Sequence, residues 1–367
     1  MDITRYIIWG GLTVIYLVIL FLIQYPLRKR RLIPVRILVL IVKIVADLAL
    51  AYLLMVSEAP VMYVIEFYLA PLYVALSGDI AGDLLTLPVV LVRKRKNNAM
   101  MQNIVCMFCA LIYLAFGTAN MQIITANRTT FRSGKLHNKY KIVFVSDLHY
   151  GSAQGKDTVE NMIVKISVDN PDLVILGGDI VDEYTTKEEM EHVFAEFGRL
   201  KVPVYFIYGN HDRQISCAAI GGRTYSDEDL TAALSSNDII DVRDEWFYPG
   251  DDLMIMGRED VSSPDRKDPS FADFGSCDEY VLVADHSPYE FDENFRMSID
   301  LQLSGHSHAG QIFPMEYLYK LAGYQAYGTY ENGNAKLFVS SGAAGWCFPF
   351  RSQEGCHYEV ITLEPEG

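Results

Sequence analysis

Long apolar segments in the first third of the chain constrain its fold more than any other feature. Residues 7–25 and 99–118 contain no charged side chain, and residues 37–56 contain only Lys43 and Asp47. A helix of about 20 apolar residues can cross about 30 Å of hydrocarbon, whereas a helix in a soluble core seldom stays apolar on every face. We therefore expect these segments to span a membrane.

A fourth apolar segment, residues 61–92, contains three acidic side chains and two prolines, Pro71 and Pro88. We interpret it as one long or kinked span, which gives an N-terminal bundle of about four transmembrane helices within residues 1–124. Arg5 is the only basic residue before the first segment and no small-residue cleavage site stands out, so we do not expect a cleaved signal peptide.

Basic residues between the spans predict the orientation of the bundle. Five Lys or Arg residues lie within residues 28–36 and four within residues 93–96, whereas residues 57–60 contain none. Because such basic loops remain in the cytoplasm, four spans place the chain beyond residue 125 outside it. This predicts an integral protein of the cell membrane with an extracytoplasmic domain. A second crossing within residues 61–92 would instead move that domain into the cytoplasm.

Four charged residues within the spans allow more than one interpretation. Lys43 and Asp47 are four residues apart and can pair on one face of a helix. Asp79 and Asp83 have the same spacing but like charge, which permits a proton or ion site inside the membrane. We favour the other interpretation, in which these two residues lie at the interface near a helix end.

The net charge divides the chain at the same boundary. The whole chain carries −15, and its first 124 residues contain 11 Lys or Arg and 6 Asp or Glu, so the remainder carries −20. We expect no nucleic-acid partner for so acidic a domain, because nucleic-acid binding needs Lys and Arg to neutralise phosphates. Residues 125–140 are polar and basic, and we interpret them as a linker to an α/β domain of residues 141–367.

Short β-rich runs in residues 141–367 each end in a cluster of polar residues. Strands of this kind, separated by helical stretches, describe an α/β enzyme whose site gathers at the strand ends. Asp and neutral His are ligands suited to Zn, Mn or Fe, and neighbouring Gly residues let the backbone turn sharply. We assign no role to His137, His192 and His357, which lie outside the clusters. The clusters contain Asp147, His149, Asp179, Asp182, Asn210, His211, His286, His306 and His308.

The order of motifs in these clusters resembles that of the calcineurin-like metallophosphoesterase family. The motifs are Asp-Leu-His, Gly-Asp-Ile-Val-Asp, Gly-Asn-His-Asp, a His before Ser-Pro, and Gly-His-Ser-His, and the resemblance extends over residues 141–367. Five motifs in order are far more specific than one short pattern. The run Gly-His-Ser-His-Ala-Gly-Gln-Ile is most similar to the membrane-anchored YkuE-type subgroup. The resemblance implies a four-layer α/β/β/α sandwich.

The resemblance also implies a role for each residue of the motifs. Three residues would bind a first divalent metal: Asp147, His149 and His308. Three would bind a second: Asn210, His286 and His306. Asp179 would bridge the two metals. Two residues would be catalytic, His211 beside the scissile phosphate and Asp182 as the residue that orients His211.

These roles predict a binuclear-metal phosphoesterase that hydrolyses a phosphoester or pyrophosphate bond. Two divalent cations, Mn, Zn or Fe, would lower the pKa of a bridging water, and the resulting hydroxide would attack phosphorus in line. Four spans exceed what an anchor requires, which favours a phospholipid-like substrate in the bilayer. The alternative is a non-catalytic metal-binding membrane sensor or scaffold, in which we would expect some of these residues to be lost.

Several further residues of this domain permit alternative interpretations. Glu183 stands where related Ser/Thr protein phosphatases have Arg, which argues against that subgroup. Trp346, Phe348 and Phe350 line an acyl groove or, as we favour, pack in the core. Arg351 binds a substrate phosphate or lies solvated at the surface. Four cysteines would permit three disulfide pairings outside the cytoplasm: Cys217, Cys277, Cys347 and Cys356.

Overall fold

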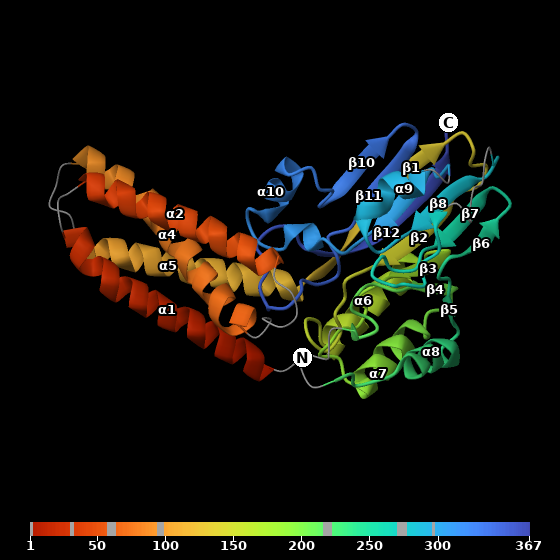
Figure 1. The fold of residues 1–367 in the computed structure, drawn as a ribbon, viewed down its shortest axis with the longest axis horizontal. Helices are drawn as coiled ribbons and strands as arrows, with labels where there is room; N and C mark the ends of the chain where they lie inside the picture. Colours follow the sequence, from red (N-terminus) through yellow and green to blue (C-terminus); the bar gives the residue numbers. More distant parts are fainter. Residues whose placement is uncertain are drawn as a thin grey trace.

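The computed structural model consists of a helical bundle and a two-sheet α/β part, which together form an elongated molecule (Figure 1). The bundle is formed by the first third of the chain and extends away from the sheets. The residues described are 3–29, 33–56, 64–93, 99–215, 222–269, 277–295 and 298–367.

Four long apolar helices form the bundle. They are α1 (Ile3–Lys29), α2 (Ile33–Val56), α4 (Ala70–Arg93) and α5 (Ala99–Gln122), with a π-helical turn, η2 (Ile65–Leu69), leading into α4. All four are long and apolar enough to cross a membrane, as the sequence predicts. The first residues of the predicted segment 61–92 lie outside the described ranges. The rest of it, η2 and α4, forms a single passage that contains both prolines.

Helices α4 and α5 approach each other closely at two glycines. A Cβ on Gly78 would lie 2.2 Å from the Cα of Ala110, and a Cβ on Gly82 would lie 2.4 Å from the Cα of Cys106. Small residues four apart let membrane helices approach and gain van der Waals contact, because hydrocarbon provides no hydrophobic drive for helices to associate. A larger side chain at Gly78 would therefore push the two helices apart.

Charged residues inside the bundle pair across three helices. Lys43 of α2 lies 2.6 Å from Asp79 of α4, and Arg28 of α1 lies 3.2 Å from the same carboxylate. Asp47 instead accepts a hydrogen bond from Ser77 at 2.8 Å. Lys43 therefore pairs with Asp79, although the spacing had allowed a pair with Asp47. Asp79 lies well inside α4 and not, as had been favoured, near a helix end. The physical reason is that a charge in hydrocarbon needs a close counter-charge, which neighbouring helices provide here.

Two mixed six-stranded sheets form the α/β part. The first has the order β1-β12-β2-β3-β4-β5 and the second β10-β11-β9-β8-β7-β6. The strands of the first sheet are β1 (Ile124–Ser133), β2 (Tyr140–Val145), β3 (Leu173–Gly177), β4 (Val204–Ile207), β5 (Ile239–Asp241) and β12 (Cys356–Pro365). The strands of the second sheet are β6 (Glu245–Gly250), β7 (Leu253–Gly257), β8 (Tyr280–Ala284), β9 (Leu301–Ser304), β10 (Gly328–Asn332) and β11 (Ala335–Val339).

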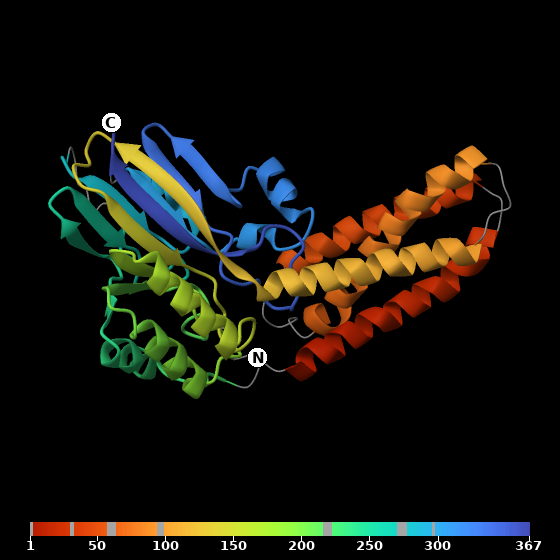
Figure 2. The ribbon, with the colours of Figure 1, turned by 180° about the vertical axis from the view of Figure 1, so that it is seen from behind.

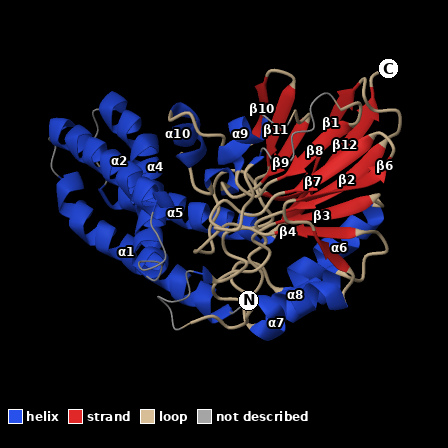
Figure 3. Ribbon diagram, turned by 45° about the vertical axis from the view of Figure 1, so that its right-hand side comes forward, coloured by secondary structure: helices blue, strands red, loops and turns tan. Residues whose placement is uncertain are grey.

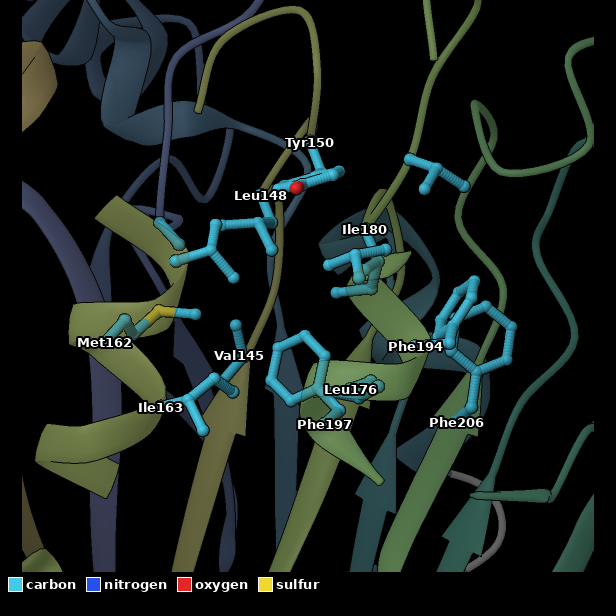
Figure 4. Close-up of a cluster of buried hydrophobic side chains, with 14 of the residues drawn as sticks. Val145, Leu148, Tyr150, Met162, Ile163, Leu176, Ile180, Phe194, Phe197 and Phe206 are labelled. Carbon is cyan, nitrogen blue, oxygen red and sulfur yellow. The ribbon is translucent and has the colours of Figure 1, made fainter. Parts of the chain in front are cut away.

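Helices cover the outer faces of both sheets and give the expected four layers. Helices α6 (Lys156–Asp169), α7 (Lys187–Phe197) and α8 (Asp227–Ser236) pack on the first sheet over the buried apolar core of Figure 4. A second apolar core lies between the two sheets. The short helix α9 (Phe291–Asn294) covers the second sheet. Because β3 is covered on both faces, each of its residues is buried and its sequence is apolar throughout.

Most of the stretch predicted as a linker, residues 125–140, is an edge strand. Strand β1 follows α5 almost directly (Figure 2) and pairs in parallel with β12, from Ile124 opposite Cys356 to Ser133 opposite Pro365. The linker prediction failed because β1 is an edge strand with many exposed residues, so its composition is polar and basic. Its basic side chains form salt bridges; Arg132, for example, lies 2.7 Å from a glutamate of β12.

Loops of the α/β part pack against the membrane bundle. Phe350, in the loop after β11, stacks on Trp9 of α1 with ring centroids 5.7 Å apart and meets Tyr113 of α5 edge-on at 5.1 Å. Phe348 belongs to the same apolar cluster, as do residues of α10 (Met315–Leu321). These aromatics therefore pack in a core, as favoured, but that core is shared with the membrane helices. Figure 3 shows the loops gathered between the strands and the bundle.

Candidate metal centre

Side chains that follow five strands meet in two groups. The carboxyl ends of neighbouring parallel strands share one edge of a sheet, so residues distant in sequence converge there. Within each group the candidate ligand atoms all lie within 4.8 Å of one another. The groups are Asp147, His149 and His308, and Asp179, His286 and His306. Asn210, after β4, joins the second group, because its Oδ1 lies 2.9 Å from Nδ1 of His306.

The backbone at these positions is held in an unusual conformation. A positive φ is uncommon outside glycine and is retained only where the surrounding structure enforces it. Five of the seven predicted ligands have one, with φ between 45° and 69°. Clustering of this strain at strand ends is typical of a functional site. The five residues are Asp147, His149, Asp179, His306 and His308.

Two glycines make room for the carboxylates of the site. A Cβ on Gly209 would lie 2.2 Å from Oδ1 of Asp179, and a Cβ on Gly305 would lie 2.2 Å from Oδ2 of Asp147. No other residue fits where two chain segments approach so closely. The glycines of the Gly-Asn-His-Asp and Gly-His-Ser-His motifs therefore allow a close approach of two chain segments in addition to the sharp turns that the sequence predicts.

The histidines of the two groups are oriented through Nδ1. His286 donates to the carbonyl at the end of β3 at 2.9 Å, and His308 donates to the carbonyl of Ala344 at 3.1 Å. Nδ1 of His149 lies 3.1 Å from Asp182. Such contacts fix an imidazole ring and leave Nε2 for a metal. Among the described residues, Nε2 of His149 is buried and has no hydrogen-bond partner, so the donor set fits divalent cations with nitrogen and oxygen ligands.

Two buried carboxylates give the site a strong negative character. Asp147 and Asp179 are almost completely buried. Burial favours their neutral forms, but the neighbouring His308 and His286 outweigh it and hold the pKa of Asp147 below its ordinary value. His286 and His211 hold the pKa of Asp179 well below its ordinary value. Two ionised carboxylates removed from water require positive charge nearby, which divalent cations would provide.

Glu183 orients His211, and the predicted role of Asp182 in this is wrong. Nδ1 of His211 lies 2.7 Å from the Glu183 carboxylate, whereas Asp182 faces His149. Burial opposes protonation of His211, but Asp179 and Glu183 outweigh it and raise the pKa of His211 to about 10. The error arose because the two acidic residues are adjacent, and adjacent side chains point in different directions. The sequence alone did not show which of them reaches the imidazole.

Asp212, to which the sequence analysis gave no role, ties two loops of the site together. Its carboxylate accepts hydrogen bonds from the backbone N–H groups of Asp179 at 2.8 Å, Ile180 at 2.9 Å and Gly209 at 2.6 Å. The loops after β3 and β4 are thereby held in one arrangement. Asp212 is the last residue of the Gly-Asn-His-Asp motif, and this position could have indicated its role from the sequence.

Arg351 supports the loop of His308, so both interpretations offered for it are wrong. The side chain is fully buried. Its guanidinium donates to the carbonyls of His308 at 3.0 Å, Ser341 at 2.5 Å, Ala344 at 2.6 Å and Glu354 at 2.6 Å. The planar fork of arginine can reach several carbonyls at once. Arg351 therefore stabilises the loops that carry His308 and Ala344, and it does not bind substrate.

At least two of the four cysteines of the α/β part do not form a disulfide. Cys277 and Cys356 are free thiols, and Cys217 lies outside the described residues. The Asp, Asn and His ligand set needs no thiolate, so we assign no ligand role to the cysteines.

Comparisons with known proteins show which family this chain resembles. Residues 140–310 match the family described as calcineurin-like phosphoesterase. An uncharacterized metallophosphoesterase of Helicobacter pylori (strain J99) is 31% identical over 63% of this chain, and the match spans 62% of the length of that relative. The uncharacterized metallophosphoesterase YkuE of Bacillus subtilis (strain 168) is 28% identical over 61% of this chain and 79% of its own length. A transmembrane protein with metallophosphoesterase domain from Danio rerio is 24% identical over 62% of this chain and 54% of its own length.

Proposed function

The chain carries a calcineurin-like metallophosphoesterase domain, and from this premise we propose that it is a membrane-embedded hydrolase of lipid-linked phosphoester or pyrophosphate bonds. The observation that carries the proposal is the pair of ligand groups, each with its candidate ligand atoms within 4.8 Å of one another. The ring contact between His149 and His308 and that between His286 and His306, at 5.3 and 5.2 Å, support the same two centres.

We infer that two divalent cations, Mn, Zn or Fe, occupy these centres. The first would be held by Asp147, His149 and His308, and the second by Asn210, His286 and His306, with Asp179 shared between them. When bound, such a pair supplies Lewis-acid charge and lowers the pKa of a water that attacks phosphorus. The residues around the cations then determine orientation and proton transfer.

His211 is the proposed proton donor to the leaving oxygen. Glu183 holds its Nδ1 at 2.7 Å, so Nε2 is the nitrogen that is left to face a substrate. A protonated imidazole there offsets charge on the phosphoryl oxygens and can hand its proton to the departing group. The ring of Trp346 lies 5.4 Å from that of His211 and covers one side of it.

The substrate class and the location follow from how the two parts of the molecule meet. Phe348 and Phe350 pack on the membrane helices, so the loops that carry the site lie next to the bundle. The −20 charge beyond residue 124 repels a free phosphate from solution, whereas a substrate embedded in the bilayer arrives along the membrane. The basic residues between α1 and α2 and between α4 and α5 favour an extracytoplasmic site in the cell membrane.

The activity is tested with full-length protein in detergent, loaded with Mn²⁺ and given p-nitrophenyl phosphate and bis-p-nitrophenyl phosphate. We expect turnover of at least one ester, and a fall of about 100-fold or more in Asn210→Ala, as for loss of an electrostatic catalytic contact. Asn334→Ala, in an exposed turn, is the matched control and retains activity. Equal rates in Asn210→Ala and wild type would refute the assignment, and bound metal without any turnover would favour a non-catalytic binder.

The location is tested separately with a C-terminal epitope tag on cells that have an intact membrane. We expect added protease to remove the tag from the outside. Protection of the tag, with cleavage only after the membrane is permeabilised, would place the domain in the cytoplasm. That outcome would correct the topology without affecting the chemistry.

A further inference from the structure

A groove between the membrane helices and the α/β part has no place in the chemistry proposed above. Its volume is about 530 Å³, and we call it the tail groove. Helices α4 and α5 form most of its wall, and two loops of the α/β part close one end. Residues that define it include Ala81, Leu84, Ile112, Phe116, Phe313 and Ser352.

The tail groove occupies the half of the bundle that adjoins the α/β part. On α5 it extends from Cys109, near the middle of the helix, to Phe116, near the end that leads into β1. On α4 it extends from Tyr73 to Leu84, which is about 16 Å of helix at 1.5 Å per residue. That length matches one leaflet, about half of the 30 Å hydrocarbon core.

The residues at the rim of the tail groove are apolar and exposed. Leu84, Ile112 and Phe116 are each more than half exposed, and Phe313 extends the same surface toward the α/β part. These side chains lie in or beside helices that are long and apolar enough to span a membrane, so in a bilayer the groove would open to the lipid. Its occupant is therefore an apolar chain, because a polar group there would lose its hydrogen bonds to water.

Polar groups in the tail groove determine the orientation of the bound lipid. At the end near the α/β part, the hydroxyl of Tyr113 donates to Ser352 at 2.7 Å and lies 3.2 Å from the hydroxyl of Tyr73. About one turn deeper, Asp47 accepts a hydrogen bond from Ser77. A carboxyl group at that depth disfavours a phosphate, so an anionic headgroup belongs at the mouth. There Tyr73 and Tyr113 donate within the protein, and Ser352, which accepts from Tyr113 and from the backbone N–H of Phe313, keeps its hydroxyl proton for a phosphate oxygen.

The mouth of the tail groove is built on the same loops as the candidate metal centre. The backbone N–H of Ser352 donates to the carbonyl of Gln311 at 3.0 Å, and the side chain of Gln311 donates to the carbonyl of Trp346 at 3.1 Å. Trp346 lies beside His211, and His308 is three residues before Gln311. A headgroup at the mouth is therefore adjacent to the loops that hold the metal ligands.

We propose that the tail groove holds one hydrocarbon chain of the substrate, so that the enzyme draws a lipid phosphoester from the adjacent leaflet and presents its headgroup to the metal centre. This inference rests on the proposed phosphoesterase activity. If the proposal holds, Ala81 and Ile112 are residues that determine the preference for a substrate with a long hydrocarbon chain. An ordinary lipid that merely surrounds the bundle would fill the groove without affecting the choice of substrate.

The test compares two esters with the same reacting centre, p-nitrophenyl ethyl phosphate and p-nitrophenyl hexadecyl phosphate. Metal-loaded full-length protein in nanodiscs is assayed as wild type, Ala81→Trp and Ile112→Trp. The matched control is Ile15→Trp on α1, because Ile15 is 54% exposed and Ile112 is 53% exposed, but Ile15 does not line the groove. The ethyl ester reports whether each variant is folded and active.

Wild type should have a higher kcat/KM for the hexadecyl ester, and filling the groove should reduce this preference about tenfold with little effect on the ethyl ester. Ile15→Trp should retain the full preference. Two outcomes would refute the proposal that the tail groove binds a hydrocarbon chain: both groove variants keep the preference for the hexadecyl ester, or wild type shows no preference. Either outcome leaves the phosphoesterase proposal intact. Absence of turnover of both esters, and of the simple aryl esters, would overturn the phosphoesterase proposal itself.

Discussion

Replacing Arg351 by methionine tests whether its buried guanidinium stabilises the loop that carries His308. The guanidinium donates to four backbone carbonyls, including that of His308. A hydrogen bond to a charged group contributes about 1.5–3 kcal/mol, so four set an upper limit of about 6–12 kcal/mol. Water entry and relaxation recover part of this, and we expect a loss of about 3–5 kcal/mol, as for a broken buried ionic contact.

The assay is thermal unfolding of full-length protein in detergent, combined with analysis of bound metal. A loss of about 3–5 kcal/mol lowers Tm by about 6–20 °C in a domain of this size. Bound metal should fall as well, because the His308 carbonyl loses its partner and the loop that carries the imidazole is released. Arg351→Lys should recover only part of the loss, because an ammonium has three donors and no planar fork.

Arg199→Met is the matched control for this experiment. The side chain of Arg199 is exposed and pairs with Glu196 at 2.9 Å, and such surface pairs contribute about 0–1 kcal/mol. We expect its Tm and metal content to stay close to those of wild type. If Arg351→Met behaved like this control in both measurements, the stabilising role of Arg351 would be refuted.

Three further predictions concern other contacts. Glu183→Gln should lower kcat about tenfold or more with metal content unchanged, since it removes the charge that supports proton transfer by His211; an unchanged kcat would contradict this role. Burial opposes ionisation of Asp252, but four donors, a tyrosine hydroxyl, two backbone N–H groups and the side-chain amide of Asn138, hold its pKa below its ordinary value. Its stabilisation is therefore present above the unfolded pKa of about 3.9 and is lost as pH falls through the folded value. Asp252→Asn should thus lower the urea midpoint at neutral pH by more than it does at pH 3, and an equal effect at both would contradict this. Gly78→Leu should destabilise the bundle by about 1–3 kcal/mol through overpacking, whereas Gly11→Leu, which has open space around its Cβ position, should not.

The sequence predicted those parts of the molecule that depend on residue type and local spacing. Apolar length was enough to predict four membrane helices, because hydrocarbon thickness fixes the length of a span. The order of short motifs at strand ends was enough to predict which side chains converge, because parallel strands share one edge. Asp147 and His308 are 161 positions apart, yet they lie in one group of candidate ligands.

What the sequence did not predict depends on the direction of side chains and on partners distant in the chain. Asp182 and Glu183 are adjacent acidic residues, and only the folded loop decides which one reaches His211. Arg351 looked like a surface residue because its partners are carbonyls, which leave no mark in the sequence. Strand β1 was not predicted for a similar reason. An edge strand can have a polar composition, and β1 still pairs along its whole length with β12.

The ion pairs of the bundle have a consequence for the biosynthesis of this protein. Lys43 leaves the ribosome with α2, well before Asp79 and Asp83 of α4, its partners in the folded bundle. A lone lysine at the centre of an inserting helix costs about 2.5–3.5 kcal/mol. The second helix would therefore gain from staying beside the first, where Gln24 accepts a hydrogen bond from Lys43, until the span that carries Asp79 and Asp83 is complete.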